Sequence, residues 1–263
     1  MAGEWRQILL HEVCETNPDK RDSSWPHAVI EYIDISAVGT GTLIEAPQVL
    51  TLDKAPSRAQ RLVRPGDTIV STVRPNRRSF LYLREPVPNT VVSTGFAVLR
   101  AKQDLDSKFL YYLVADQVFT DYLTAHADGS AYPAVNANVF SEAELSLPPL
   151  PEQRAIAHIL GALDDKIELN RRMNRTLESM ARALFKQWFV DGAEEGWEAG
   201  KLGDIAENVR RGAQPSDIEP ETPYIGLEHM PRRSVALTEW GQAEQVTSNK
   251  FWFKRGEILF GKL

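Results

Sequence analysis

The chain has 263 residues, of which 43% are hydrophobic and 25% charged, with a formal net charge of −6 at pH 7. This length suits two domains with ordinary cores, and the negative charge gives no support for nucleic-acid binding by bulk charge. The single cysteine, Cys14, excludes a disulfide framework and fits a reducing cytosol. No N-terminal apolar run has the length of a signal peptide or membrane helix, so we expect a cytoplasmic protein with no membrane partner.

The first 147 residues predict a mixed domain of short strands and helices. Apolar and acidic residues alternate over 28–35, which is typical of a strand. Further strands are predicted at 68–73, 79–83 and 90–100, with a possible one at 49–52, and Gly95 reads as a bulge or a close approach. Asp106 is expected to cap one helix, whose apolar face is formed by Phe109, Leu110, Leu113, Val114, Val118 and Tyr122.

A basic segment lies within this domain. Residues 58–84 contain seven arginines and one acid, Asp67, which gives the segment a net charge of +6. Arg74, Asn76, Arg77 and Arg78 form a predicted turn at the end of a strand. Arginine reads guanine and asparagine reads adenine through paired hydrogen bonds, and either can instead clamp phosphates. The alternative is a solvated turn without a partner.

A second cluster of candidate binding residues lies in the loop 129–138. Its hydroxyl, aromatic and amide side chains suit hydrogen bonding, although such residues are common in any loop. Together the two clusters give the candidate DNA-binding residues Arg74, Asn76, Arg77, Arg78, Ser130, Tyr132 and Asn136.

Residues 147–190 open with a proline-rich segment and continue as a long predicted helix. After Gly161 it has no glycine or proline until the Asp191-Gly192 stop, and at 1.5 Å per residue it would be about 60 Å long. Apolar residues recur every seven positions in two rows, with two asparagines near the middle, which indicates a coiled-coil seam. The candidate helix-pairing residues are Ile156, Leu160, Leu163, Ile167, Asn170, Asn174, Leu177, Leu184 and Trp188. A core helix of one globular domain is the alternative, but such a helix would outspan the core.

After this helix the sequence of the first domain begins again. With Trp5 set on Trp197, Leu10 falls on Leu202, and Tyr32-Ile33 falls on Tyr224-Ile225. After a loss of two residues, 66–70 falls on 256–260. Three ordered matches at nearly one offset predict a duplicated domain, of which the second copy covers only the first half.

The sequence contains no recognisable catalytic apparatus. It has no glycine-rich phosphate loop and no nucleophile elbow, and its five histidines lack metal-ligand spacing. Asp164-Asp165-Lys166 has the order of a nuclease acid-x-Lys element, but it lies on the predicted helix, where charged residues usually form a solvated face. We therefore expect no catalytic residue, no metal site and no cofactor in this chain.

Several stretches taken together resemble a known family. They are Gly66-Asp67-x-Ile69-Val70 with Arg74-Pro75, residues 93–99, residues 109–113, Gly129-Ser130-x-x-Pro133, and above all Leu147-Pro148-Pro149-Leu150-x-Glu152-Gln153-x-x-Ile156. Each is weak alone, but the ordered set, with the long helix and the repeat, resembles the specificity subunit of type I restriction–modification systems over the whole chain.

This resemblance implies a fold and a set of partners. The fold is α+β: a target-recognition domain with a small sheet (1–147), a coiled-coil spacer helix (148–192) and the incomplete start of a second recognition domain (193–263). Each domain of such a subunit reads half of a bipartite double-stranded DNA site. Modification subunits supply S-adenosylmethionine for adenine methylation, and restriction subunits supply ATP-driven cleavage with Mg. Because the second helix is missing here, we expect a homodimer through the spacer helix. A protein–protein scaffold assembled through this helix is the alternative.

Overall fold

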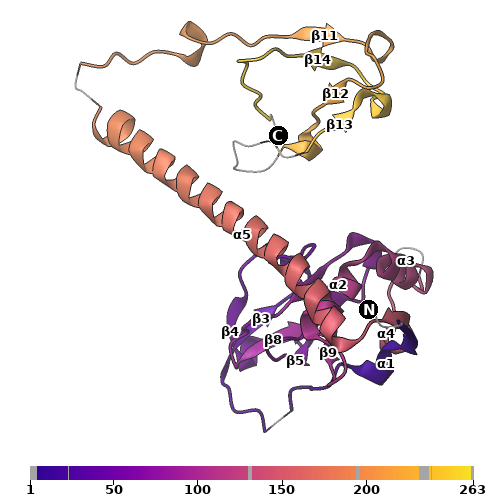
Figure 1. Ribbon diagram of the computed structural model, residues 1–263. Coiled ribbons are helices and arrows are strands. Elements are labelled where there is room, and N and C mark those ends of the chain that lie inside the picture. The colour runs from indigo at the N-terminus through magenta and orange to yellow at the C-terminus, as the bar shows by residue number, and fades with distance from the viewer. Residues whose placement is uncertain are drawn as a thin grey trace. The chain divides into compact units, whose positions relative to one another are not determined.

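The structure is a computed structural model that describes residues 5–22, 24–129, 132–193, 196–230, 237 and 239–261. It divides into two compact units, residues 1–184 and residues 185–263, which we describe separately (Figure 1). The first unit combines small sheets with helices and ends in a long helix, so the predicted α+β class is confirmed.

Two four-stranded sheets form the centre of the first unit. The first is antiparallel and has the order β2 (Cys14–Thr16), β9 (Phe96–Ala101), β6 (Thr68–Ser71) and β7 (Phe80–Tyr82). The second has the order β4 (Gln48–Thr51), β3 (Val29–Ile33), β8 (Thr90–Ser93) and β5 (Ala59–Leu62), with β3 and β8 parallel. A separate pair joins β1 (Arg6–Leu9) to β10 (Glu144–Leu147).

The alternation of side chains along these strands builds three apolar clusters. Phe96 and Val98 of β9 point into the cluster that also holds Ile33, Ile69 and Val92, whereas Ala97 and Leu99 point to the other face. That other face is covered by helices, in the largest cluster. A smaller cluster with Ile30, Tyr32 and Val91 covers the outer face of the second sheet. Buried strands with two covered faces read as continuous apolar runs, as β9 does from Phe96 to Leu99.

The predicted strand over 90–100 is two strands in two different sheets. The chain crosses between them at Thr94-Gly95, where β8 ends and β9 begins. A Cβ on Gly95 would lie 2.1 Å from Cδ1 of Ile35, so the expected close approach is confirmed and the bulge within one strand is wrong. Sequence reasoning also missed β2, β5 and β10, because each has only three or four residues.

The predicted helix after Asp106 is two helices, α2 (Ser107–Ala115) and α3 (Gln117–Ala125). Asp106 caps α2, since its Oδ1 accepts hydrogen bonds from the backbone N–H groups of Lys108 and Phe109. Asp116 has extended backbone angles and caps α3 in the same way, at 2.8 Å from the N–H of Val118. The expected apolar face is therefore interrupted, and Val118 is 75% exposed. Two shorter helices are α1 (Leu10–Val13) and α4 (Ala137–Ser141).

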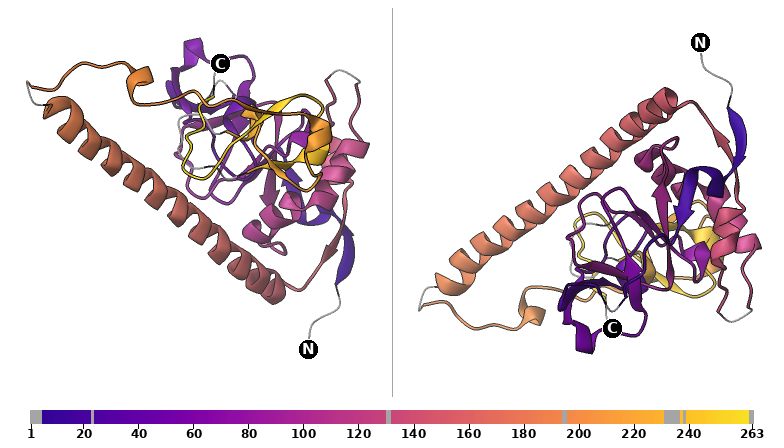
Figure 2. Two further views of the ribbon diagram at one scale, coloured as in Figure 1. Left: turned by 90° about the horizontal axis from the view of Figure 1, so that it is seen from above. Right: turned by 90° about the horizontal axis from the view of Figure 1, so that it is seen from below.

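The long helix α5 (Leu150–Lys186) confirms the predicted rod and continues as a π-helical turn, Gln187–Asp191. Its first turns bury one face, formed by Gln153, Ala157 and Gly161, and its last turns extend away from the two sheets (Figures 1 and 2). Gln153 is 1% exposed. Its Oε1 accepts from the N–H of Asp106 at 2.9 Å, and its Nε2 donates to the carbonyls of Asp104 and Pro148. Gln153 thus anchors the start of α5 to Asp106, the N-cap residue of α2. In the part of the chain that the structure describes, no helix is long and apolar enough to cross a membrane.

The second unit contains two short ladders, β11 (Arg211–Ala213) with β14 (Lys250–Trp252), and β12 (Pro223–Tyr224) with β13 (Gly241–Gln242). Local geometry of the first unit recurs in it. Gly66 and Gly256 both have φ of +89°. Each is the third residue of the same four-residue turn. A hydrogen bond of 2.7 Å closes it, from the N–H of Arg64 to the Asp67 carboxylate and from the N–H of Lys254 to the Glu257 carboxylate. Among its described hydrophobic residues, only Ala213 and Val246 are buried.

Candidate nucleic-acid interface

The arginine-rich turn after β6 is held in an unusual backbone conformation. Arg74 and Arg78 have φ of 49° and 55°, in the left-handed region that non-glycine residues seldom adopt, and Pro75–Arg77 forms a 3₁₀ turn between them. Pro75 is buried under the turn. Asn76 and Arg77 are exposed, so their side chains are available to a partner.

This turn is joined to the second predicted cluster. The N–H of Arg74 donates to the carbonyl of Pro133 at 2.7 Å. The Arg74 guanidinium carbon lies 4.6 Å from the centre of the Tyr132 ring, in a cation–π contact. Tyr132 is nevertheless 61% exposed. The structure therefore brings two clusters that lie almost 60 residues apart in the sequence onto one surface, with cations, an amide and an aromatic ring.

Arg78 points into the protein and not outward with Asn76 and Arg77. Its Nη2 donates to the carbonyl of Ala115 at 2.5 Å, and its Nη1 donates to Gln117 and to Thr120. Its guanidinium thereby occupies the break between α2 and α3. The expectation that this arginine contacts a partner does not match its position, because the backbone turn directs the side chain towards the helices.

The remaining predicted residues have different positions. Ser130 lies outside the described residues. Asn136 is exposed at the N-terminus of α4, where its side chain makes no capping hydrogen bond. The neighbouring Val135 N–H donates to the carbonyl of Thr72 at 2.8 Å, which fixes this segment beside the end of β6.

Two arginines that sequence reasoning did not select lie at the same end of the sheets. Arg58 precedes β5, and its carbonyl accepts from the N–H of Thr94 at 2.8 Å. The Nη2 of Arg61 donates to the carbonyl of Thr94 at 3.3 Å. The adjacent Gly95 accepts from the N–H of Thr72 at 2.8 Å, two residues before Arg74. Both arginines belong to the basic segment 58–84, which the sequence already marks by its net charge of +6. Only the pairing of β5 with β8 brings them next to the Arg74–Arg78 turn.

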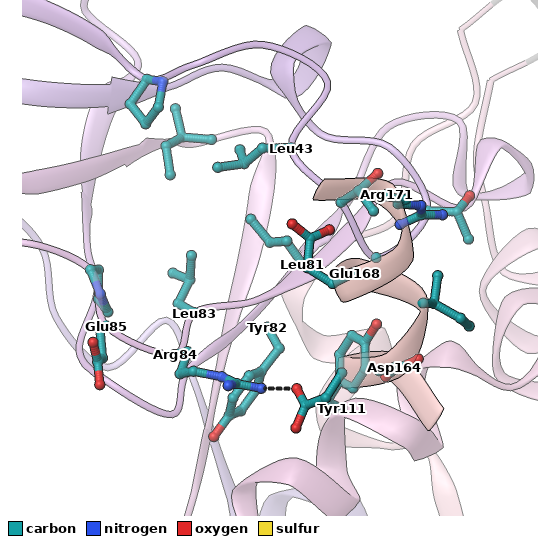
Figure 3. Close-up of a pocket in the computed structure, with 18 of the residues that line it drawn as sticks. Leu43, Leu81, Tyr82, Leu83, Arg84, Glu85, Tyr111, Asp164, Glu168 and Arg171 are labelled. Carbon is teal, nitrogen blue, oxygen red and sulfur yellow. Dashed lines mark hydrogen bonds and ion pairs between the residues drawn. The ribbon is translucent and has the colours of Figure 1, made fainter. Parts of the chain in front are cut away.

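A groove of about 990 Å³ lies between α5 and the segment that includes β7 (Figure 3). Asp165 and Arg84 form an ion pair of 2.7 Å across it, and the hydrogen bond from Arg84 lowers the pKa of Asp165. Both side chains are more than half exposed, so the pair adds little stability. Asp164 accepts from the Tyr112 hydroxyl at 2.7 Å. The acid-x-Lys element thus consists of two carboxylates with structural contacts. In the described ranges, no group of three or more His, Cys, Asp or Glu side chains could hold a metal ion.

The predicted helix-pairing residues divide into two groups. Ile156 packs against the core of the first unit, and Leu160 is half-buried. The others are exposed along α5 and its continuation: Leu163, Ile167, Asn170, Asn174, Leu177, Leu184 and Trp188. Met173 and Met180, which the two rows did not include, are 52% and 56% exposed. They flank the row of Leu163, Asn170, Leu177 and Leu184, so the exposed apolar stripe is wider than predicted.

Comparison with known proteins identifies relatives of this chain. A family model described as type I restriction modification DNA specificity domain matches residues 3–179. The chain is 29% identical over 193 residues to the type I restriction enzyme HindI specificity subunit of Haemophilus influenzae, covering 72% of this chain and 41% of that protein. It is 28% identical over 200 residues to the MjaIX specificity subunit of Methanocaldococcus jannaschii, covering 68% and 45%.

The fold is similar to a solved structure. The crystal structure of the HsdS subunit from Thermoanaerobacter tengcongensis is 28% identical, with a TM-score of 0.56, and the match covers 83% of this chain and 55% of that one. The chain therefore spans less than half the length of the two curated relatives and little more than half of this structural one.

Proposed function

This chain belongs to the type I restriction modification DNA specificity family, and on that premise we propose that it is the DNA-recognition component of a type I restriction–modification complex. Its first domain reads one half of a bipartite double-stranded DNA site. The chain itself is not an enzyme: methylation and cleavage belong to partner subunits.

The observation that carries this proposal is the contact between the arginine-rich turn and the Tyr132 loop. Arg74 lies over the Tyr132 ring, and its backbone N–H bonds to Pro133. Asn76 and Arg77 are exposed beside it. Guanidinium and amide groups of this kind contact base edges and phosphates, and aromatic rings are common at such surfaces. We propose Arg74, Asn76, Arg77, Tyr132 and Asn136 as the DNA-contacting residues.

The test is DNA binding by the full chain assembled with its modification subunits. A randomised duplex library should yield an enriched bipartite motif, and affinity for any duplex should fall steeply as salt rises, because phosphate contacts release counterions. The proposal would be overturned if the assembly enriched no sequence and its affinity for DNA did not change with salt concentration.

The catalytic partners would supply the chemistry that this chain lacks. We propose that modification subunits bind along α5 and bring S-adenosylmethionine for adenine methylation. Restriction subunits would add ATP-driven cleavage with Mg. The proposed setting is the cytoplasm. The α5 rod supports this assembly, because it extends beyond the first domain with its apolar stripe uncovered in the single chain.

We propose that residues 193–263 begin a second recognition domain. The recurring turn of Gly66 and Gly256 supports this. A matching strand contact supports it too: Lys20 and Arg61 form an antiparallel β-bridge in the first unit. Gly212 and Phe251, which align with them, are paired in the second unit. We propose that two copies of α5 pair antiparallel through their exposed apolar stripe, which would place identical first domains at opposite ends. Such a dimer would read a palindrome split by a spacer.

A scaffold role is the competing proposal, and the exposed apolar stripe of α5 is the observation that favours it. Leu177, Leu184 and Trp188 are 55%, 43% and 58% exposed, as expected for a helix that awaits a protein partner. Salt separates the two functions. Apolar scaffold contacts should hold as salt rises, whereas DNA contacts through the arginines should weaken.

A further inference from the structure

Arg58 has the setting of a side chain that is fixed in place before it meets a ligand. Its Nη2 lies 2.6 Å from Oδ2 of Asp34, whose side chain is only 11% exposed, whereas that of Arg58 is 55% exposed. The Tyr32 hydroxyl donates to the same Oδ2 at 2.7 Å, and the N–H of Ser36 donates to Oδ1 at 3.3 Å. Tyr32 is itself 1% exposed, so the carboxylate stands on a rigid base.

This arrangement favours the ionised carboxylate. Burial alone would raise the pKa of Asp34, but the hydrogen bonds from Tyr32 and Ser36 and the charge of Arg58 outweigh it, and the pKa is lowered. Asp34 uses one end of the guanidinium fork. The Arg58 side chain is 55% exposed, so a ligand can reach its guanidinium while Asp34 holds one end. The ion pair leaves the side chain less conformational entropy to lose on binding.

The location of Arg58 links it to the proposed DNA surface. Ile33 of β3 lies opposite Val92 of β8, so Asp34 follows β3 at the end of the sheet where β8 turns into β9. Arg58 bonds to Thr94 at this turn, and the adjacent Gly95 bonds to Thr72 at the start of the Arg74 turn. Arg58 and the Arg74–Arg77 turn therefore lie at one end of the two sheets.

A base contact suits this pair better than a phosphate contact. The charges of Arg58 and Asp34 cancel, so the pair attracts the DNA backbone weakly and would release few counterions. A guanidinium held at one end by a buried carboxylate is instead suited to the paired acceptors of a guanine edge, O6 and N7.

The second unit also favours a base contact over a phosphate contact for this pair. Its alignment keeps the frame of the turn, with Lys254, Gly256 and Glu257 at the positions of Arg64, Gly66 and Asp67. It does not keep the pair: Gly226 stands at the position of Asp34, and Ser248 at that of Arg58. Loss of the pair where the frame of the turn is kept is expected if the two domains share a scaffold and read different bases.

We propose that Arg58, positioned by Asp34, reads a base edge in the DNA half-site, and that this base is a guanine. Arg58 is then a specificity-determining residue and Asp34 a positioning residue. The inference rests on the proposed function and adds to it a base contact outside the two clusters that the sequence indicates.

The test uses the full chain assembled with its modification subunits and a randomised duplex library. The charge-balanced variant Arg58→Gln with Asp34→Asn should relax the preference for one G·C pair by roughly 5- to 150-fold. Its affinity for unrelated duplex and its salt slope should remain those of the parent. Arg58→Lys keeps the charge and the carboxylate partner but lacks the fork, so it should relax the same position. The matched control is Arg6→Gln, an exposed arginine of β1 that lies outside α5 and outside the proposed DNA surface.

An unchanged motif in both Arg58 variants, with thermal unfolding equal to that of the parent, would overturn the inference. A uniform loss of affinity for all duplexes, with a lower salt slope, would make Arg58 a phosphate contact and also overturn it. If the parent assembly itself enriches no sequence, the proposed function fails and the inference fails with it.

Discussion

Arg100 binds Asp67 through two parallel hydrogen bonds, from Nε to Oδ1 at 2.8 Å and from Nη2 to Oδ2 at 2.7 Å. The pair joins β9 to the turn before β6, and Arg100 also contacts Asp19 at 2.6 Å. The Asp67 side chain is 1% exposed, so this pair is almost wholly shielded from water on the carboxylate side.

We predict that Arg100→Ala lowers the free energy of unfolding by roughly 3–5 kcal/mol, because it leaves a buried carboxylate without its cation. Urea unfolding of the full chain measures this loss. Arg64→Ala is the control: Arg64 pairs with Asp19 at 3.0 Å but is 65% exposed, and its loss should cost less than about 1 kcal/mol. Equal losses in the two variants would contradict the assigned role of Asp67.

We predict that the Gln153 side chain stabilises the fold by anchoring the start of α5. Gln153→Ala removes the partners of the Asp106 N–H and of the Asp104 and Pro148 carbonyls. Because an unsatisfied buried polar group costs roughly 1–3 kcal/mol, we expect a loss of stability of that size or more. Thermal unfolding should show it, whereas Gln103→Ala, at an exposed position nearby, should leave the melting temperature unchanged. A melting temperature equal to that of the parent would mean that water replaces the amide.

Arg77 and Arg78 should differ although they are neighbours. Arg77→Gln should lower the salt slope of DNA binding by about one and leave stability unchanged, because Arg77 is exposed. Arg78→Gln should instead reduce stability, since Arg78 holds the break between α2 and α3. Fluorescence anisotropy against salt and urea unfolding separate the two effects. The assignment fails if Arg78→Gln alters the salt slope of a fully folded protein.

Cys14 should report global unfolding. Burial raises the pKa of its thiol to about 12, and the side chain is 2% exposed. At pH 8 only about one thiol in ten thousand would be ionised, and the thiolate is the reactive form. Because the chain has no other cysteine, labelling with iodoacetamide should be slow in buffer and should become fast at the urea concentration where the chain unfolds. Rapid labelling of the folded protein at pH 8 would show that β2 opens locally.

Asn170 and Asn174 should set the register of helix pairing at a cost in stability. Asn170→Leu with Asn174→Leu is expected to raise the melting temperature and to broaden the distribution of oligomers in sedimentation at micromolar concentration. A lower melting temperature would show that the two amides belong to a satisfied polar network. A well-behaved parent monomer would refute the pairing itself.

Sequence reasoning was most successful where the pattern was long or the chemistry local. The period of α5 extends over ten turns, and the strand at Ile30–Ile33 alternates clearly. It failed at 90–100, where the crossing at Thr94-Gly95 lies inside one expected strand, and at 107–125, where apolar residues continue on both sides of Asp116. The break in each depends on one small event: the contact of Gly95 with Ile35, and the cap formed by Asp116. Local propensity does not reveal contacts between segments that are distant in the chain.

The candidate interface shows the same limit. Composition identified the arginines, and the sequence indicated the turn, but the inward direction of Arg78 depends on its left-handed backbone and on helices 40 residues away. The pairing of Arg58 with Asp34 was equally hidden, because it requires β3 and β5 to lie on either side of β8.

The loops at this end of the sheets are tied together by main-chain hydrogen bonds. They run from Thr72 to Gly95, from Arg74 to Pro133 and from Thr94 to Arg58. A bond between backbone groups does not depend on which side chain the residue carries. Exposed side chains at these positions can therefore be exchanged without loss of the support beneath them. Such a surface is evolvable: new sequence preferences can arise by single substitutions at little risk to folding, and a designer could vary the same positions in a library.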